Sequence, residues 1–509
     1  MRLVYALKSF ILITVLAFSA CIEKSPKNST PANSEQLKEI LESNINPSDT
    51  FQLSERAEDL ALAKKIDEII SNSDLADARW GVFVVSLKDG RLIVGRDIDR
   101  PFIPASIMKL LTSVVAIDKL GKDFRWQTKL LSTGRIENGV LRGDLILYGQ
   151  GAPDLDDTGI KILVSKLKEL GIRRVQGDII GDESYFLADN LGDGWLWNEI
   201  QWYYGAEASA LSINLNQAQI KLNDGRPSFD EFIQAYFDVQ TPRSEMRDSI
   251  GVKRELCQNR VYVWGTGRNL NVKIAVQNPA LWAARILKEE MQRAGIQVSG
   301  DIRSVNWRTA NRPEIKMANE LAVIDSKPLS EIVYGMNKHS INLYAELILR
   351  TLGKKFGELV PEDDPKFREV RTDDRAGIAV IKQWLSEHEI TLHKSEAIHD
   401  GSGLSRLNLL TPQTIGRALI AATKIKDSEV FLNSLPIAGK DGTMTNRLYD
   451  LSNKLIAKTG NITSVASLAG YLNLKDETLV FVVLSNNVYD STKANELIDE
   501  LVREISLLH

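Results

Sequence analysis

The residues whose types and spacing indicate chemistry begin with a serine and a lysine three positions apart, Ser106 and Lys109. Pro104 precedes them and an apolar run follows, which predicts a buried helix that begins here. Residues three apart on a helix share a face, and burial lowers the pKa of a lysine until it can accept a proton. A serine hydroxyl needs such a base to become a nucleophile. An exposed lysine at an ordinary helix start gives the same pattern, so this pair decides nothing alone.

A second element combines Ser340 with Asn342, two positions further on. The serine hydroxyl can pass a proton to a leaving amine. The Asn amide can accept a hydrogen bond from a lysine and donate one to a substrate carbonyl. Taken by itself, this element is more typical of a serine that caps the N-terminus of a helix.

A third element, formed by Lys458, Thr459 and Gly460, follows a short apolar strand near the C-terminus. The cation and the hydroxyl suit a substrate carboxylate, and the glycine lets an extended peptide lie along the strand edge. The three elements occur in the order S-x-x-K, S-D-N, K-T-G, the set found in penicillin-binding proteins and class A β-lactamases. Ile341 stands where that set has Asp, but the proposed chemistry uses only the flanking residues. The sequence therefore predicts a serine acyl-transfer enzyme.

From about residue 56 to its end, the chain resembles the D-alanyl-D-alanine carboxypeptidase/endopeptidase family, the class C low-molecular-mass penicillin-binding proteins. Six short segments carry the resemblance: residues 104–109 (PASIMK), 195–197 (WLW), 203–206 (YYGA), 399–406 (HDGSGLSR), 435–443 (LPIAGKDGT) and 457–460 (AKTG). The resemblance implies an α+β fold. In it, a penicillin-binding, serine β-lactamase-like transpeptidase domain, an antiparallel sheet with helices, carries two nested insert domains.

The resemblance also implies an activity, that of a D-Ala-D-Ala carboxypeptidase and DD-endopeptidase acting on peptidoglycan stem peptides. Ser106 would attack the carbonyl of the penultimate D-Ala with Lys109 as base. The backbone N–H groups of Ser106 and Asn461 would stabilise the oxyanion, and Lys458 and Thr459 would hold the terminal carboxylate. β-Lactam antibiotics are expected to act as covalent inhibitors, because they present the same groups.

Three further residues are implied by the resemblance to hold the substrate. Asp182 and Phe186 resemble insert-domain residues that reach back toward the nucleophile and contact the substrate side chain, and Arg406 resembles the arginine of the same pocket. The alternative is that Asp182 merely ends a strand and Arg406 caps a turn.

Two other functions share these motifs. A β-lactamase or serine esterase would use the same residues, but the long insert between the first two motifs argues against it. A catalytically silent wall-binding protein would have no chemical need for an intact set of Ser106, Lys109, Asn342 and Lys458.

The length of the chain and an internal sequence repeat predict the domain organisation. A chain of 509 residues exceeds what one hydrophobic core supports. Residues 168–179 (KELGIRRVQGDI) resemble residues 291–302 (MQRAGIQVSGDI), which indicates two copies of one helix-turn-strand unit, although so common a pattern also recurs by chance. We expect a catalytic domain over 56–120 and 327–509, an insert domain over 121–212 and 277–326, and an inner insert over 213–276.

The N-terminus predicts export to the periplasm or cell envelope. Residues 1–20 contain two basic side chains and a short apolar run, as in a signal peptide. Cys21 follows LAFSA, which resembles a lipobox, and lipidation of Cys21 would tether the enzyme to a membrane. A simple secretory signal with an incidental cysteine is the alternative. Residues 21–55 are polar and predict a tether.

Other function classes find no support in the sequence. The net charge is −4 and no dense Lys/Arg block occurs, which excludes a nucleic-acid partner. His388, Glu389 and His393 are spaced one residue too widely for a zinc pair on one helical face. We therefore expect neither a metal nor another cofactor.

Overall fold

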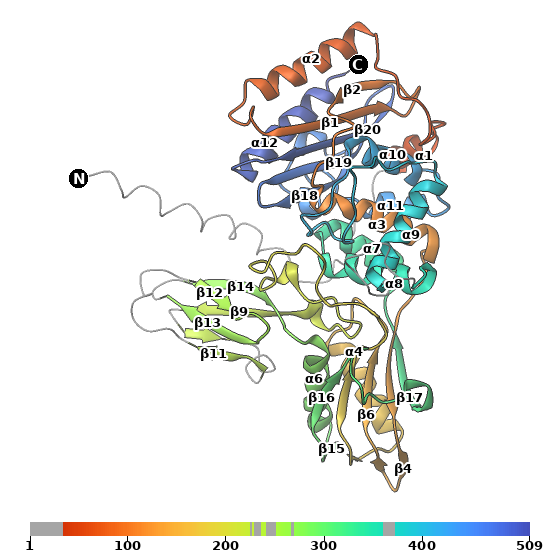
Figure 1. The fold of residues 1–509 in the computed structure, drawn as a ribbon, viewed down its shortest axis with the longest axis vertical. Coiled ribbons are helices and arrows are strands. Elements are labelled where there is room, and N and C mark those ends of the chain that lie inside the picture. Colours follow the sequence, from red (N-terminus) through yellow and green to blue (C-terminus); the bar gives the residue numbers. More distant parts are fainter. Residues whose placement is uncertain are drawn as a thin grey trace, which may run out of the picture.

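The computed structural model describes residues 34–223, 226–228, 236–240, 251–265, 269–359 and 372–508. Figure 1 shows an elongated molecule in which one body contains both the beginning and the end of the described chain, while the middle of the chain forms a second part. The predicted signal peptide and Cys21 lie outside the described residues. No helix within these ranges is long and apolar enough to cross a membrane.

A five-stranded antiparallel sheet forms the centre of the first body. Its strand order is β18 (Leu455–Ile462), β19 (Val465–Asn473), β20 (Thr478–Asn486), β1 (Arg79–Ser86) and β2 (Leu92–Arg96). Strands from the two ends of the chain thus build one sheet. β18 is an edge strand, and residues 436–438 pair with the outer side of its first residues, where Ile437 bridges Ile456.

Helices cover both faces of this sheet, and alternate residues of β1 point to opposite faces. Val82 and Val84 belong to the cluster with α2 (Ala57–Ser71) and α12 (Ser491–Ile505). Phe83 and Val85 pack instead with the helices of the second face. These helices are α3 (Met108–Leu120), α7 (Leu329–His339), α8 (Asn342–Phe356), α9 (Asp373–Glu387), α10 (Pro412–Ala422) and α11 (Ser428–Ser434).

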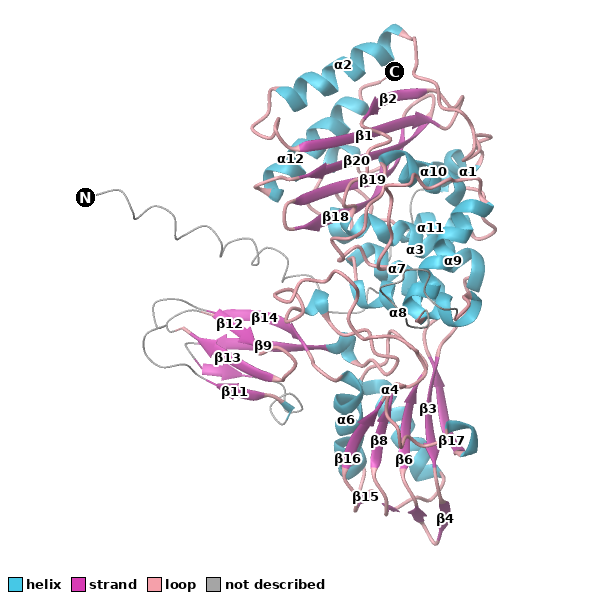
Figure 2. Ribbon diagram, in the orientation of Figure 1, coloured by secondary structure: helices cyan, strands magenta, loops and turns pink. Residues whose placement is uncertain are grey.

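The chain leaves this body after α3 and returns at α7, and the residues between them form sheets of their own (Figure 2). The larger is a mixed sheet in the order β16 (Ile302–Val305), β8 (Ile179–Asp182), β6 (Leu145–Gly149), β3 (Gln127–Ser132) and β17 (Asn319–Asp325). The smaller is β15 (Gln297–Val298), β7 (Arg174–Val175), β5 (Val140–Arg142) and β4 (Arg135–Glu137).

The two similar segments, residues 168–179 and 291–302, lie side by side in these sheets. The first copy runs from α4 (Asp157–Glu169) into β7 and β8, and the second runs from α6 (Pro279–Arg293) into β15 and β16. β15 pairs in parallel with β7, and β16 pairs in parallel with β8. Equivalent strands of the two copies are therefore neighbours.

Residues 213–276 form two three-stranded sheets, which project to the side of the molecule (Figure 1). One contains β10 (Arg226–Ser228), β9 (Gln217–Asn223) and β14 (Leu270–Ala275), and the other β11 (Asp238–Gln240), β13 (Arg260–Trp264) and β12 (Gly251–Arg254). The boundaries proposed for the catalytic domain and its inserts remain predictions.

The predicted tether ends earlier than expected. The helix α1 (Ser34–Leu41) buries Leu37 and Ile40 in the helical core of the first body. Phe51 packs edge-on against Phe83, with ring centroids 5.9 Å apart. Residues 34–55 are therefore not a free tether, because their few apolar side chains find a core surface to cover.

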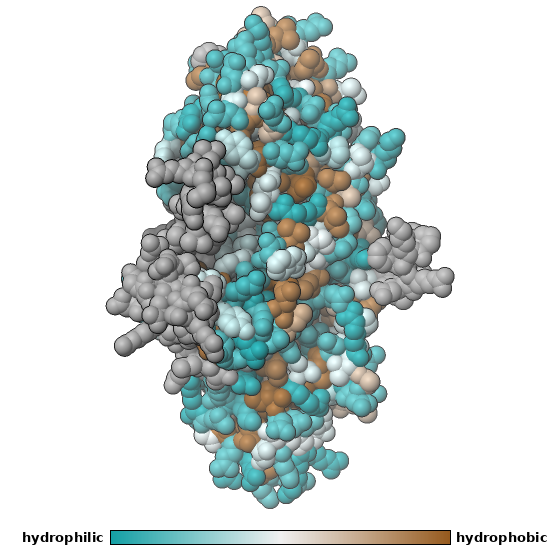
Figure 3. Space-filling model, turned by 60° about the vertical axis from the view of Figure 1, so that its left-hand side comes forward, coloured by the Kyte–Doolittle hydropathy of each residue, from teal (hydrophilic) through white to brown (hydrophobic). Residues whose placement is uncertain are grey.

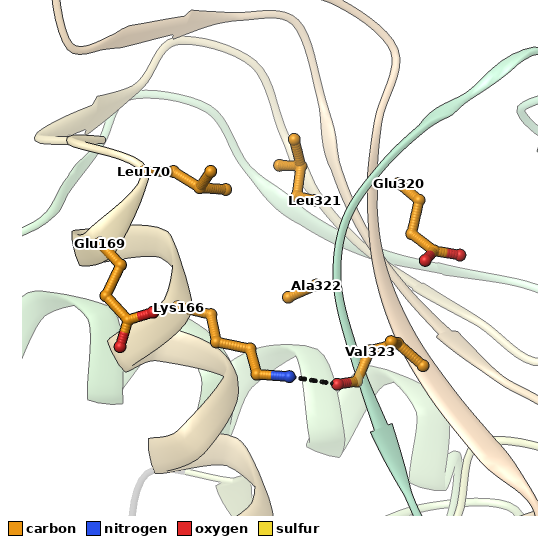
Figure 4. Close-up of a pocket in the computed structure, with 7 residues that line it drawn as sticks. All are labelled: Lys166, Glu169, Leu170, Glu320, Leu321, Ala322 and Val323. Atoms are coloured by element: carbon orange, nitrogen blue, oxygen red, sulfur yellow. Dashed lines mark hydrogen bonds between the residues drawn. The ribbon is translucent and has the colours of Figure 1, made fainter.

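On the face drawn in Figure 3, apolar side chains lie in separate patches within a largely hydrophilic surface. A pocket between α4 and β17 is shown in Figure 4, where the Nζ of Lys166 donates to the Val323 carbonyl oxygen at 2.5 Å. None of the predicted site residues lines this pocket.

Candidate active site

Ser106 lies in a 3-10 turn, η1 (Ala105–Ile107), directly before α3. Ala105 has a φ of 51°, in the left-handed region that costs a side chain energy. Gly403 packs against this turn, and a Cβ at position 403 would lie 1.8 Å from the Ala105 carbonyl oxygen. The turn that contains Ser106 is thus strained and tightly enclosed, while Ser106 itself stays half-buried.

Lys109 is completely buried, one helical turn after Ser106. Its Nζ lies 2.9 Å from Ser106 Oγ, 2.6 Å from Asn342 Oδ1 and 2.7 Å from the Ser402 carbonyl oxygen. Burial lowers the pKa of Lys109 to about 7, against the opposing charges of Asp400 and Glu346. The amine can therefore take the Ser106 proton near neutral pH.

Ser340 and Asn342 lie at the junction between α7 and α8. Ser340 ends α7 with a left-handed φ of 57°, and Asn342 begins α8. The Nδ2 of Asn342 donates to the Tyr204 carbonyl oxygen at 2.8 Å, which leaves Oδ1 to face Lys109. The second motif therefore meets the first through a hydrogen bond.

Lys458, on the edge strand β18, is fully buried. Its Nζ donates to Ser340 Oγ at 2.9 Å, which brings the third motif to the second. Burial and the nearby charge of Lys109 hold the pKa of Lys458 well below its usual range. Thr459 Oγ1 donates to Thr443 Oγ1 at 2.7 Å, so Thr443 adds a second hydroxyl beside the strand.

Gly460 is required by the close approach of β18 to the nucleophile turn. A Cβ at this position would lie 2.3 Å from Ser467 Oγ and 3.0 Å from the backbone nitrogen of Ser106. A side chain here would displace one of the two N–H groups proposed for the oxyanion. The exposed Asn461 follows, its side-chain oxygen accepting from Asn495 Nδ2 at 2.9 Å.

Arg406 lies at the end of the loop that also supplies the Ser402 carbonyl. Its Nη1 donates to the carbonyl oxygen of Thr463, beside the end of β18, and its Nη2 lies 3.6 Å from Glu199 Oε1. Arg406 Nε and Glu199 Oε2 are buried and have no hydrogen-bond partner among the described residues. Buried polar atoms are normally satisfied, so these two atoms and Asp182 Oδ2, which is in the same state, are exceptions in this part of the structure.

Residues 62–506 match the D-Ala-D-Ala carboxypeptidase 3 (S13) family. The chain belongs to this family. It is 29% identical over 464 residues to the D-alanyl-D-alanine carboxypeptidase DacB of Haemophilus influenzae, a match that covers 87% of this chain and 88% of that protein. It is 26% identical to a D-alanyl-D-alanine carboxypeptidase of an Actinomadura species, covering 84% and 81% respectively.

A solved structure gives the same result for the fold. The crystal structure of penicillin-binding protein 4 from Haemophilus influenzae matches with a TM-score of 0.74 and 25% identity, covering 87% of this chain and 99% of that one. The same Haemophilus protein has also been solved in complex with a β-lactam. The predicted α+β fold, the family and the serine carboxypeptidase class of hydrolase are all confirmed.

Two residues carried over from the family resemblance, Asp182 and Phe186, lie inside the protein. Asp182 is fully buried at the end of β8, where it accepts from the backbone N–H of Ser184 and burial raises its pKa. Phe186 is buried in the cluster that contains Leu343 and Leu347. Ile341, directly before Asn342, packs against the same cluster. Asp182 Oδ2 has no hydrogen-bond partner among the described residues. The substrate contacts carried over for these two residues stay predictions.

Sequence reasoning missed Glu199 and Tyr204 of the insert. Tyr204 touches the site through its carbonyl oxygen, and its ring lies close enough to Glu199 for that charge to raise its pKa, together with burial. Burial also raises the pKa of Glu199, while Arg406 opposes the shift. Both residues lie within or beside the WLW and YYGA segments, but nothing in their spacing relates them to Arg406.

The same insert loop is attached to the loop of residues 399–408. Trp195 Nε1 donates to Asp400 Oδ2 at 3.0 Å, and His399 Nδ1 lies 3.1 Å from Asp193 Oδ2. The insert thus forms one wall of the active site. Within the described part of the chain, no cluster of His, Cys, Asp and Glu could hold a metal ion.

Proposed function

We propose that this chain is a serine-type D-Ala-D-Ala carboxypeptidase and endopeptidase that works through an acyl-enzyme at Ser106. The observation that carries the proposal is the contact of the Lys109 amine with the Ser106 hydroxyl at 2.9 Å, in a chain of the carboxypeptidase family. A nucleophile within hydrogen-bond reach of its base, and a base held by further groups, is the arrangement that covalent catalysis requires.

Acylation begins when Ser106 Oγ attacks the carbonyl carbon of the penultimate D-Ala and its proton moves to Lys109 Nζ. The backbone N–H groups of Ser106 and Asn461 are proposed to hold the oxyanion. As the tetrahedral intermediate collapses, the C–N bond breaks and the terminal D-Ala nitrogen takes a proton from Ser340 Oγ, which Lys458 contacts. The proton that Lys109 took from Ser106 replaces it, so Lys109 is neutral again. Water then attacks the ester and gives its proton to Lys109, which returns it to Ser106 Oγ as the C–O bond breaks and the shortened peptide leaves.

The terminal carboxylate of the substrate is assigned to Lys458, Thr459 and Thr443. The two hydroxyls lie 2.7 Å apart and can both turn toward a carboxylate oxygen. A bound carboxylate would also favour the charged form of Lys458, whose pKa burial otherwise lowers. A substrate carboxylate would thus supply the negative charge that no Asp or Glu among the described residues supplies to Lys458 through an ion pair.

The substrate side chain is assigned to Glu199, Tyr204 and Arg406, in addition to the predicted contacts of Asp182 and Phe186. The unpartnered Glu199 Oε2 and Arg406 Nε offer one acceptor and one donor. A side chain that ends in both an ammonium and a carboxylate group matches this pair, as in a stem-peptide diamino acid.

Residues 1–20 are proposed to direct export, and Cys21 to carry a lipid that anchors the enzyme in the envelope. Composition of the leader and the LAFSAC segment support this assignment. The mass of the mature N-terminus tests it, since cleavage anywhere other than before Cys21 contradicts the anchor.

Digestion of purified muropeptides, with products identified by mass, tests the activity. Release of single D-Ala residues from pentapeptides shows the carboxypeptidase, and separation of cross-linked dimers into monomers shows the endopeptidase. Ser106→Ala is the control, and products that persist in this variant contradict the assignment of the nucleophile.

A further inference from the structure

The Lys109 amine has three oxygen neighbours, and they differ in what they can do. Asn342 Oδ1 and the Ser402 carbonyl oxygen can only accept hydrogen bonds, whereas the Ser106 hydroxyl can also donate. A neutral amine has two N–H groups and one lone pair. The two acceptors therefore take both N–H groups, and the lone pair is left facing the Ser106 proton.

This orientation of the Lys109 amine depends on the position of the Ser402 carbonyl oxygen. Ser402 lies in a loop, so other residues must hold that carbonyl in place. The backbone N–H groups of Gly401 and Ser402 both donate to Oε1 of Glu346, at 3.0 and 2.9 Å. Glu346 lies on α8, one turn after Asn342, and is almost fully buried. Its second oxygen accepts from Arg350 Nη1 at 2.9 Å, which keeps the carboxylate in place.

We propose that Glu346 is a positioning residue for catalysis: by holding the Gly401–Ser402 turn, it aims the Ser402 carbonyl at Lys109 and so directs the lone pair of the base to Ser106. One helix, α8, then supplies both orienting acceptors, directly through Asn342 and indirectly through Glu346. The inference rests on the proposed function only in taking Lys109 as the base.

The charge of Glu346 acts on Lys109 as well. The charged groups around the amine are Glu346, Asp400 on the supporting loop, Lys458 on β18, and Arg350, which pairs with Glu346. Burial lowers the pKa of Lys109, and the negative charge of Glu346 opposes this. Removing that charge lowers the pKa further, so the neutral amine persists to lower pH.

The test compares Glu346→Gln with Glu346→Leu. Glutamine keeps an oxygen for the two N–H groups but loses the charge, and leucine loses both. Arg350 retains the carbonyl oxygens of Glu346 and Asp189 as partners in either variant. Asp59→Asn is the matched control, because Asp59 is a fully buried carboxylate paired with Arg91, and it lies on α2, which covers the face of the sheet opposite α3.

The measurement is the rate of acylation by benzylpenicillin from about pH 5 to pH 9, together with urea unfolding. Glu346→Leu is expected to lower the rate by about 10²-fold, the lower end of what a general base contributes. Glu346→Gln is expected to stay within about threefold of the parent on the plateau, with the acidic limb of its profile moved to lower pH. Asp59→Asn should lose stability with an unchanged profile.

Three results would overturn the inference: a folded Glu346→Leu that acylates within about threefold of the parent, equal losses in both variants, or an unmoved acidic limb in Glu346→Gln. If Glu346→Leu does not fold, the acidic limb of the pH profile of Glu346→Gln alone decides whether the inference holds. A parent protein that benzylpenicillin does not acylate contradicts the proposed function instead, so the two failures are distinguishable.

Discussion

The guanidinium of Arg406 lies 3.6 Å from the carboxylate of Glu199, and this ion pair joins the insert to the loop that supports the catalytic lysine. The insert thus contacts the loop that holds the Ser402 carbonyl oxygen against Lys109. Its removal would open the wall beside β18 and take the partner of Arg406 with it.

We expect Glu199→Gln to change substrate preference more than nucleophile reactivity. The loss of charge should raise KM for a stem peptide whose side chain ends in an ammonium group, by about tenfold for one charged hydrogen bond. Hydrolysis of a small thioester without that side chain should be unaffected. Steady-state kinetics with both substrates check this, and equal losses on the two would contradict a pocket function for Glu199.

The variant Asp182→Ala is the counterpart in the same insert. Because Asp182 is buried in the sheet, its loss should lower stability. The urea midpoint and the same pair of substrates measure this. A selective loss on the stem peptide would support the substrate contact predicted from the sequence, and an unchanged ratio of the two substrates would contradict it.

Acylation should depend on pH through Lys109. Burial lowers the pKa of this amine to about 7, and only the neutral form has a lone pair for the Ser106 proton. The rate should therefore rise with pH up to about 7 and level off above it, falling about tenfold per pH unit on the acidic side. Lys109→Ala should lose about 10² to 10⁴ in rate with its fold retained. A folded variant within tenfold of the parent would remove Lys109 from this function.

Gly460→Ala should damage catalysis directly. Its Cβ would press on Ser467 Oγ and on the Ser106 backbone nitrogen, so the oxyanion donors must move. We expect a loss of about 10²-fold or more in acylation, as for the removal of one oxyanion donor. Gly335→Ala is the control, because its Cβ would meet only Tyr344 at an ordinary 3.4 Å. Equal rates in the two variants would contradict the close approach.

Benzylpenicillin should form a stable adduct at Ser106, detectable by intact mass and by a fluorescent derivative. The drug presents a strained amide and a carboxylate in the arrangement of acyl-D-Ala-D-Ala. The groups that bind the dipeptide should therefore also bind the drug. The opened ring stays attached and obstructs water, which makes deacylation slow. Rapid hydrolysis of benzylpenicillin would indicate a β-lactamase. Labelling that persists in Ser106→Ala would contradict the assignment of Ser106 as the nucleophile.

The sequence by itself determined the chemistry and the framework of the catalytic body. Ser106 and Lys109 share a helical face by spacing alone, and the hairpins β1–β2 and β19–β20 follow from apolar runs separated by turn residues. Such features depend on residues near one another in the chain, where 3.6- and 2-residue periods set the geometry. The order of the three motifs was then enough to indicate the family.

Only the tertiary structure decided which distant side chains meet. Asp182 and Glu199 are both acidic residues of the insert, and nothing in their local sequence shows that one is enclosed in a sheet while the other faces Arg406. Glu346 likewise resembles any acidic residue on a helix until the fold brings Gly401 and Ser402 against it. These contacts join segments remote in sequence, so they are set by how the insert and the loops pack on the catalytic body, which local periodicity does not encode.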